Sequence, residues 1–151
     1  MRNRRGGAMA RYHTTIHSRR SIQEAFDYLA EFSSAVEWDP SVIEAKRLTD
    51  GPIGPGSKFR IVATFLGRRI PLDYQVTEYE PCRRVVLTAD SAMIRSVDQI
   101  TFTVTSSGTD VTYDANLQAR GALRLAGPLL SLVFGHIGNR ARGGLRRELN
   151  R

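Results

Sequence analysis

The 151-residue chain has 41% hydrophobic and 25% charged residues, an ordinary globular composition that can bury a core without disulfides or metals. Its single cysteine, Cys82, excludes an internal disulfide and is typical of a reducing compartment. The longest apolar run, LLSLVF, is far too short to span a bilayer, and no apolar signal core follows the basic start MRNRRGG. We therefore expect a soluble, cytoplasmic protein without a transmembrane segment.

The net charge of +7 is concentrated at the two ends of the chain. We predict a disordered basic tail over residues 1–9, followed by a single domain over residues 10–151. The arginine-rich C-terminal segment, NRARGGLRRELNR, suits an anionic surface or an acidic protein partner. It lacks the aromatic residues on which single-stranded nucleic acids stack, so no specific nucleic-acid partner is expected.

The first elements in the chain are a strand and two short helices. Apolar and polar residues alternate over 10–18, which predicts a strand. The sequence SIQE at Ser21 is a capping box with Glu24, and apolar residues at helical spacing extend that helix to about Phe32. One further helical turn is predicted in SSAVEWDP, and Pro40 ends it.

Six strands and one long helix follow. The strands are predicted over 42–49, 57–66, 69–80, 83–90, 96–105 and 109–120, with short connections typical of an antiparallel meander. The helix begins near Pro128 and carries the longest apolar stripe, formed by Leu130, Phe134, Ile137, Ala141, Leu145 and Leu149. This order predicts an α+β fold in which the helix covers a curved seven-stranded antiparallel sheet.

The stretch FRIVATFLGRRIPLDYQV at 59–76 predicts a hairpin with one apolar face. With Gly67-Arg68 as a two-residue turn, every pair on one face is apolar. The pairs are Phe65 with Ile70, Ala63 with Leu72, Ile61 with Tyr74, and Phe59 with Val76. Whether this face meets a packed core or a cavity is left open by the pattern. The hydroxyls of Tyr74 and Tyr113 need partners if buried, and the helix glycines 135, 138, 143 and 144 leave gaps beside it.

The chain resembles a known family in several segments. AFDYLAEFSSAVEWDPSV, GPGSKFRI and VTEYEPCRRVVL are similar to those of the polyketide cyclase/dehydrase and lipid-transport family, in the START-like (SRPBCC) superfamily. The resemblance extends from about Ala10 to Leu149 and implies a helix-grip fold with a deep hydrophobic cavity. Members bind lipids, sterols, polyketides, quinones or plant hormones, and some are cyclases or hydrolases. The positions that match cavity-facing positions of the family are Trp38, Phe59, Ile61, Tyr74, Val76, Tyr113, Phe134 and Ile137.

Other motifs do not add up to a catalytic or metal site. GPIGPGSK at 51–58 has the glycine spacing of a phosphate loop, but its Ser-Lys order is reversed and a strand follows it, so a turn is predicted. His13 and His17 share a strand face without further ligands, and His136 lies off the helix stripe. Asp90, Asp98 and Asp114 receive no acid or base role because their faces are ambiguous. We expect no cofactor and no metal.

Three functions therefore compete. The first is binding, with or without transport, of a hydrophobic or amphipathic small molecule such as a lipid, polyketide or quinone. The second is an aromatase/cyclase-type enzyme that uses the same cavity. The third is a toxin-like or ribosome-associated interaction protein that acts through the basic C-terminal helix.

Overall fold

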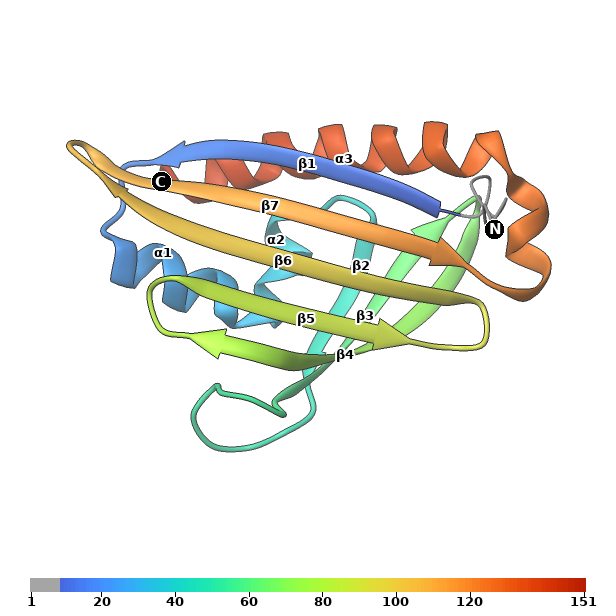
Figure 1. The fold of residues 1–151 in the computed structure, drawn as a ribbon, viewed down its shortest axis with the longest axis horizontal. Helices are drawn as coiled ribbons and strands as arrows, with labels where there is room; N and C mark the ends of the chain where they lie inside the picture. The colour runs from blue at the N-terminus through green and yellow to red at the C-terminus, as the bar shows by residue number, and fades with distance from the viewer. Residues whose placement is uncertain (1–8) are drawn as a thin grey trace, which may run out of the picture.

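The computed structural model describes residues 9–151, which form one seven-stranded antiparallel sheet with helices against its concave side (Figure 1). The strands are β1 (Met9–Ser18), β2 (Val42–Arg47), β3 (Lys58–Phe65), β4 (Arg68–Glu80), β5 (Arg84–Asp90), β6 (Ile94–Thr105) and β7 (Gly108–Ala119). Their order is β1-β7-β6-β5-β4-β3-β2, so β2 to β7 form the predicted meander and β1 joins beside β7. The tail predicted over residues 1–9 lies outside the described residues except for Met9, with which β1 begins.

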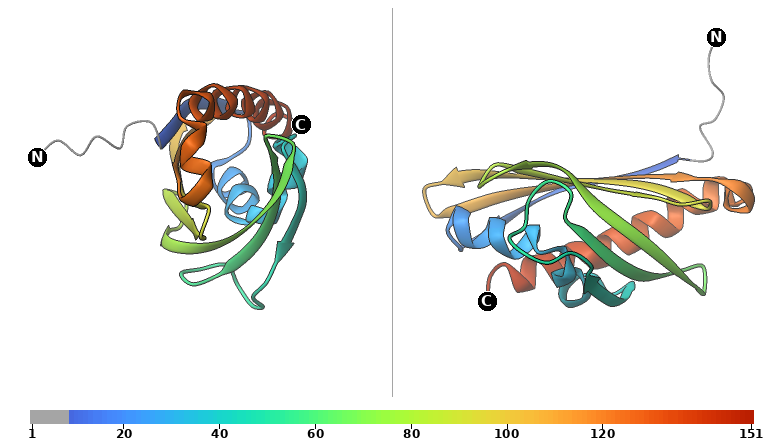
Figure 2. Two further views of the ribbon diagram at one scale, coloured as in Figure 1. Left: turned by 90° about the vertical axis from the view of Figure 1, so that its right-hand side faces the viewer. Right: turned by 90° about the horizontal axis from the view of Figure 1, so that it is seen from below.

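Two short helices follow β1 and one long helix ends the chain. The helices are α1 (Ile22–Ala30), the 3-10 turn η2 (Phe32–Ser34), α2 (Ala35–Trp38), the 3-10 segment η3 (Gly121–Ala126) and α3 (Pro128–Glu148). Figure 2 shows the sheet curling around the interior while α3 lies along its open side. The predicted fold is confirmed: a curved seven-stranded antiparallel sheet, two short helices after the first strand, and a long C-terminal helix.

Helix α1 begins where the capping box predicts. The Ser21 hydroxyl accepts a hydrogen bond from the Glu24 backbone N–H, and the Glu24 carboxylate accepts one from the Ser21 N–H, both at 3.2 Å. These bonds satisfy two N–H groups that have no partner inside the helix. The helix buries Ala25, Phe26 and Leu29 against the sheet, so the local signal and the packing agree.

The hairpin between β3 and β4 has a different register from the predicted one. Phe65 pairs with Arg68 and Ile61 with Leu72, so the two-residue turn is Leu66-Gly67 and not Gly67-Arg68. Both turn residues have positive φ, 52° and 74°, as a type I′ turn requires. The register therefore differs by two residues, which keeps the same side chains on the same face. The predicted apolar face survives, although each of its predicted pairings is wrong.

Helix α3 approaches its neighbours more closely than side chains would allow. A Cβ at Gly144 would overlap the carbonyl oxygen of Trp38 in α2, and a Cβ at Gly138 would overlap the ring of Tyr12 in β1. At these two positions the space beside the helix is filled, which corrects the expectation that its glycines leave gaps. Gly135 and Gly143 face open space, so their missing side chains have no comparable packing role.

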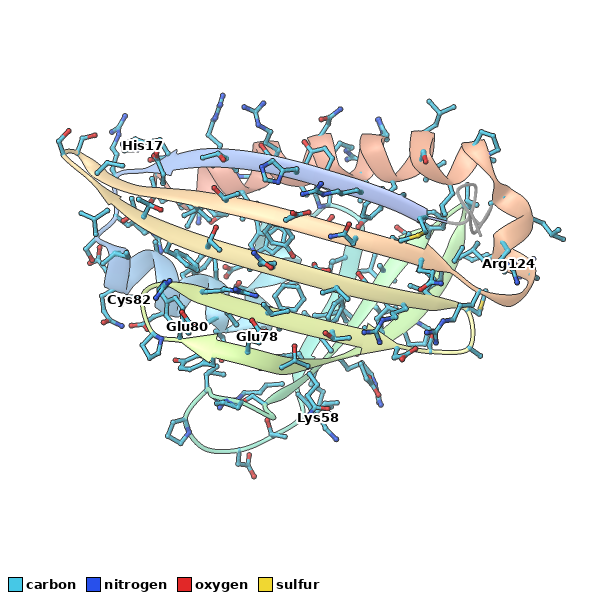
Figure 3. All side chains as sticks on the ribbon, viewed as in Figure 1. His17, Lys58, Glu78, Glu80, Cys82 and Arg124 are labelled. Carbon is cyan, nitrogen blue, oxygen red and sulfur yellow. The ribbon has the colours of Figure 1, made fainter. Side chains whose placement is uncertain are left out.

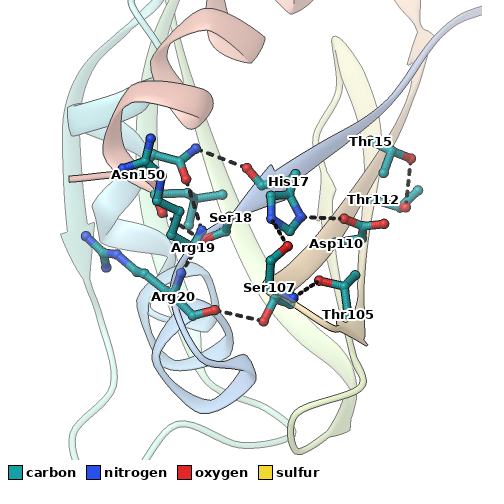
Figure 4. A network of polar contacts seen from close by, with 12 residues as sticks. Thr15, His17, Ser18, Arg19, Arg20, Thr105, Ser107, Asp110, Thr112 and Asn150 are labelled. Atoms are coloured by element: carbon teal, nitrogen blue, oxygen red, sulfur yellow. Dashed lines mark hydrogen bonds and ion pairs between the residues drawn. The ribbon is translucent and has the colours of Figure 1, made fainter.

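The C-terminal end of α3 is fastened to the end of β1 by polar contacts (Figure 4). The Ser18 hydroxyl donates to the Leu149 carbonyl at 2.6 Å. The Asn150 amide donates to the His17 carbonyl at 3.0 Å and accepts from the Arg19 N–H at 3.0 Å. These bonds hold the last turn of the helix against the first strand, so the helix is anchored at the end opposite η3.

The helical segment Gly121–Glu148 is long and apolar enough to cross a membrane by length and composition. The sequence-based expectation of no transmembrane segment rested on the shortness of the run LLSLVF and did not consider the whole helical segment. In the structure its buried positions Leu130, Ala141 and Leu145 pack into the core of the fold. Leu125, Leu129 and Leu132 near the start of the segment are exposed, so the segment packs into the core through one side only.

The glycine contacts predict opposite effects for two neighbouring substitutions. Gly144→Ala forces α3 away from Trp38 and should lower the free energy of unfolding by about 1–3 kcal/mol or more, the range for overpacked cores. Gly143→Ala, one residue away in open space, should raise it by up to about 1 kcal/mol because alanine favours the helix. Urea unfolding of the two variants and the parent protein measures both changes. Equal effects of the two substitutions would contradict the close approach at Gly144.

Candidate functional site

A cavity of about 130 Å³ lies between the inner face of the sheet and α3. Its walls come from every strand except β5 and from η2, α2 and α3, and most of its surface is apolar. The apolar side chains of the strands alternate toward the inside, and α3 closes the space above them. The fold therefore leaves an interior space where a fully packed core could have formed.

Six of the eight predicted site residues line this cavity. They are Trp38, Ile61, Tyr74, Tyr113, Phe134 and Ile137. Trp38 comes from α2, the next three from strands β3, β4 and β7, and the last two from α3. The structure thus brings together residues from distant parts of the chain on the concave side of the sheet.

Phe59 and Val76 face the interior but do not line the cavity. Both are almost fully buried, with exposed fractions of 0% and 1%. The ring of Phe59 lies 6.4 Å from that of Phe32, so the turn η2 covers it. Val76 pairs with Leu87, two positions along β4 from the cavity residue Tyr74. Their side chains belong to the packed core beneath the first helices.

Aromatic rings form one wall of the cavity. Trp38 and Tyr113 meet edge to face with ring centroids 5.6 Å apart, and Phe32 meets Tyr74 in the same way at 5.0 Å. The Trp38 indole N–H donates to the Ser34 hydroxyl at 3.3 Å. This hydrogen bond orients the indole, and the close approach of Gly144 holds the Trp38 backbone against α3.

A buried polar network projects from the strands into the same cavity. Tyr74 donates to the Ser96 hydroxyl at 3.1 Å, and Ser96 donates to Asp98 Oδ1 at 2.9 Å. Tyr113 donates to Asp98 Oδ2 through a very short hydrogen bond. All four side chains are buried and all four line the cavity. The tyrosine hydroxyls therefore have the partners that their burial requires, and both lead to one carboxyl group.

The Asp98 carboxyl is unusual because it is buried and forms no ion pair with a cationic side chain of residues 9–151. Burial raises its pKa from 3.8 to about 6, although hydrogen bonds from Tyr113 and Ser96 lower it. The nearby carboxyls of Asp39 and Asp114 raise the pKa further. Burial and the same carboxyl also raise the pKa of Tyr113 well above its usual value. A carboxyl that titrates near neutral pH inside a cavity can exchange a proton with a bound molecule.

Asp39 supplies a second carboxyl at the cavity. Its Oδ1 accepts hydrogen bonds from the Ser41 N–H at 2.9 Å and the Ser41 hydroxyl at 2.7 Å. Burial raises its pKa, while these bonds and the charge of Arg140 lower it. The charged side chains that line the cavity are Asp39, Asp98 and Arg142, of which Arg142 is exposed.

Sequence reasoning missed Asp98, although a signal for it existed. On β6 the buried positions are Ile94, Ser96, Asp98, Ile100 and Phe102, a strict period of two. Counting back from the apolar Ile100 and Phe102 places Asp98 on the inner face. Because a charged residue on that face contradicts the usual pattern of burial, its face was left ambiguous.

The other candidate residues lie away from the cavity lining. Figure 3 shows Cys82 beside α1, where its thiol contacts the Gln23 side chain at 3.1 Å, and Arg124 at the opposite end of the molecule. His136 is exposed, and His17 pairs with Asp110 at 2.9 Å on the surface. Residues 51–58 form the connection from β2 into strand β3, as predicted. Within residues 9–151, no group of three or more potential ligand side chains could hold a metal ion.

Several solved structures share this fold. The chain is similar to the ZhuI aromatase/cyclase from Streptomyces sp. R1128, with a TM-score of 0.76, 12% identity and 93% of each chain covered. It is similar to TTHA0849 from Thermus thermophilus (TM-score 0.75, 13% identity, 93% of this chain and 96% of that one). It is also similar to a START superfamily protein from Mycobacterium smegmatis (TM-score 0.72, 12% identity, 93% and 96%). At such identities the likeness establishes the fold alone.

Comparison of the sequence with family models is more specific. No curated protein matches the chain. The model of the family described as polyketide cyclase/dehydrase and lipid transport matches residues 9–151, which include every strand and helix of the structure. The chain therefore belongs to the polyketide cyclase/dehydrase and lipid-transport family.

Proposed function

We propose that the protein binds a hydrophobic or amphipathic small molecule in the cavity between the sheet and α3. The observation that carries this proposal is the cavity of about 130 Å³, with apolar walls and a buried polar network at one place in them. Apolar walls with few polar groups are typical of small-molecule sites. A lipid, a polyketide or a quinone has the apolar body that such walls accommodate.

Affinity and orientation would come from different parts of the site. Side chains such as Ile61, Phe134 and Ile137 remove apolar ligand surface from water, worth roughly 25 cal/mol per Å². The network of Tyr74, Tyr113 and Asp98 would then fix which end of the ligand enters first, because a buried polar group tolerates only a matching partner.

An enzyme of the cyclase/dehydrase type is the second candidate function. The observation in its favour is Asp98, a buried carboxyl with a pKa of about 6 that accepts a hydrogen bond from Tyr113. Such a group can take a proton from one carbon or oxygen of a substrate and return it to another. The family description and the ZhuI aromatase/cyclase structure support this candidate.

The basic C-terminal helix carries no function in this proposal. Arg147 and Arg151 lie 3.2 Å and 3.5 Å from the carboxylate of Glu148, so part of the charge is paired within the fold. A partner at this helix and a cytoplasmic location both stay predictions from the sequence.

The binding proposal is tested with propylbenzene as a neutral apolar probe. Trp38, the only tryptophan, lines the cavity, so its fluorescence should shift saturably as the probe enters. Ala63→Phe places a ring in the cavity and should weaken binding by at least about tenfold, or 1.4 kcal/mol. Ala122→Phe adds the same ring at an exposed position outside the lining and should leave affinity unchanged.

Calorimetric titration and native mass spectrometry of the purified protein accompany the fluorescence measurement. They detect a ligand that binds without changing the Trp38 signal, and a small molecule that copurifies. Circular dichroism of both phenylalanine variants shows that they are folded. Absence of binding by every method, or equal binding to the two variants, would contradict the proposal.

The protonation of Asp98 predicts how stability changes with pH. Because its pKa is higher in the folded protein, about 6, than in the unfolded chain, the folded state binds more protons and stability rises as pH falls. Between pH 7 and pH 4 the protein should gain about 2.4 kcal/mol relative to the Asp98→Asn variant, because one pKa unit corresponds to about 1.4 kcal/mol and the unfolded carboxyl is itself partly protonated at pH 4. Urea unfolding of both proteins at several pH values measures the difference and removes effects of other carboxyls.

A spectroscopic titration checks the same group directly. The carbonyl carbon of the Asp98 side chain, followed by NMR, should titrate with a pKa of about 6. A midpoint in the ordinary range of an exposed aspartate, with a stability difference that does not depend on pH, would remove Asp98 as the acid or base of an enzyme.

A further inference from the structure

We propose that the preferred ligand carries a protonated amine on its apolar body and that Asp98 binds this amine inside the cavity. The inference rests on the proposed function and specifies the class of ligand. It follows from three independent properties of the site: the directions of its hydrogen bonds, the balance of its charges, and the aromatic rings around it.

Within the network, the hydroxyl protons of Tyr74, Ser96 and Tyr113 are all donated to other members of the network. Tyr74 donates to Ser96, Ser96 donates to Asp98, and Tyr113 donates to Asp98. A tyrosine or serine hydroxyl has one proton to donate, and an ionised carboxylate has none. What remains toward the cavity is a set of oxygen lone pairs. A ligand group that only accepts hydrogen bonds finds no partner there, whereas an ammonium, with several N–H donors, finds more than one.

The charges of the site favour a cation for a separate reason. Asp98 is buried, and none of the ion pairs between residues 9 and 151 includes it. An isolated buried carboxylate is costly, and an opposite charge brought close to it lowers that cost. An ammonium group on the ligand would supply the positive charge that no ion pair among the described residues provides for this carboxylate.

Asp39 adds a second carboxyl to the cavity lining, and the cation that acts on it, Arg140, lies outside that lining. Of its carboxylate oxygens, Oδ1 accepts both hydrogen bonds from Ser41, and Oδ2 accepts none from residues 9–151. Arg142 is the one cationic side chain among the described lining residues, but it is exposed, whereas Asp98 is buried. A positive head group is therefore stabilised inside the cavity. A negative head group would find its one cationic partner, Arg142, only at the solvent-exposed side of the cavity.

The aromatic wall suits the same head group. Trp38 and Tyr113 meet edge to face 5.6 Å apart, and Tyr113 also donates to Asp98. Faces of such rings attract cations, most strongly when water is excluded. An amine bound at Asp98 would thus lie beside aromatic rings as well as the carboxylate, and its apolar body would extend along Ile61 and Phe134.

Four probes of similar shape test the inference: propylbenzene, 2-phenylethanol, 2-phenylethylamine and 3-phenylpropanoate. At neutral pH the amine should bind most tightly, about tenfold or more above the alcohol, since a hydrogen bond to a charged group is worth more than a neutral one. The carboxylate should bind most weakly. Trp38 fluorescence and calorimetry measure each affinity.

Two carboxyl variants isolate the role of Asp98. Asp98→Asn should weaken binding of the amine by about tenfold or more and change that of propylbenzene by less than about twofold. Asp73→Asn is the matched control, since it removes one negative charge from a carboxyl that lies outside the cavity lining and pairs with Arg60 at 2.8 Å. It should leave all four affinities unchanged. Asp39→Asn keeps the test decisive if Asp98→Asn fails to fold, because it should weaken binding of the amine more than binding of the other three probes.

The outcomes separate this inference from the proposed function. If propylbenzene binds and the amine has no advantage over the alcohol, or the carboxylate binds best, the amine preference is wrong and the binding function stands. If the amine preference persists in Asp98→Asn, the amine is not bound by this carboxyl and the inference is overturned. If none of the four probes binds, the proposed function fails, and the inference fails with it.

Discussion

Helix α3 touches the rest of the chain through its backbone at Gly138 and Gly144, and the cavity depends on that contact. Gly144 admits the carbonyl of Trp38, which places the short helix α2 against the long one. Gly138 admits the ring of Tyr12 from the edge strand, and the Tyr12 hydroxyl donates to Asn139 at 2.8 Å. The helix is thereby held between the edge strand β1 and the short helix α2. It spans the space between those contacts, and side chains do not fill that space completely.

The interior is stable enough to tolerate an unfavourable group. Asp98 lies where the alternation of β6 calls for an apolar side chain, and its neighbours Ser96 and Tyr113 stabilise it only in part. Replacement by a residue of the same shape without a charge would relieve the cost. Local departures from the rules that stabilise a fold are expected at functional sites. The cavity and the carboxyl coincide, and that coincidence distinguishes this interior from an ordinary core.

Strand periodicity predicted much of this structure because each strand has one buried face. It gave the correct face for Ile61, Tyr74 and Tyr113. The family resemblance supplied the eight predicted site residues, including those on helices, and six of the eight line the cavity. Periodicity alone does not set the hairpin register, which depends on where the turn lies. Leu66 adopts a positive φ, which leucine rarely does, so the turn could not be located from glycine preference. Which inner-face residues meet the cavity depends on where the helices lie. Phe59 is covered by η2, a placement that no strand pattern encodes.

The pairing of β1 with β7 has a consequence for how the protein is made. Ile16 pairs with Val111, and Ser18 is bonded to Leu149, so the first strand finds its partners only in the last third of the chain. During synthesis the β1 segment is made long before β7, so its partner strand does not exist until residues 108–119 have been made. Contacts so distant in sequence slow folding, and unpaired strands invite association between chains. Newly made molecules therefore expose β1 and the inner face of the sheet until β7 and α3 have been synthesised, and the cavity has no closing helix before that point.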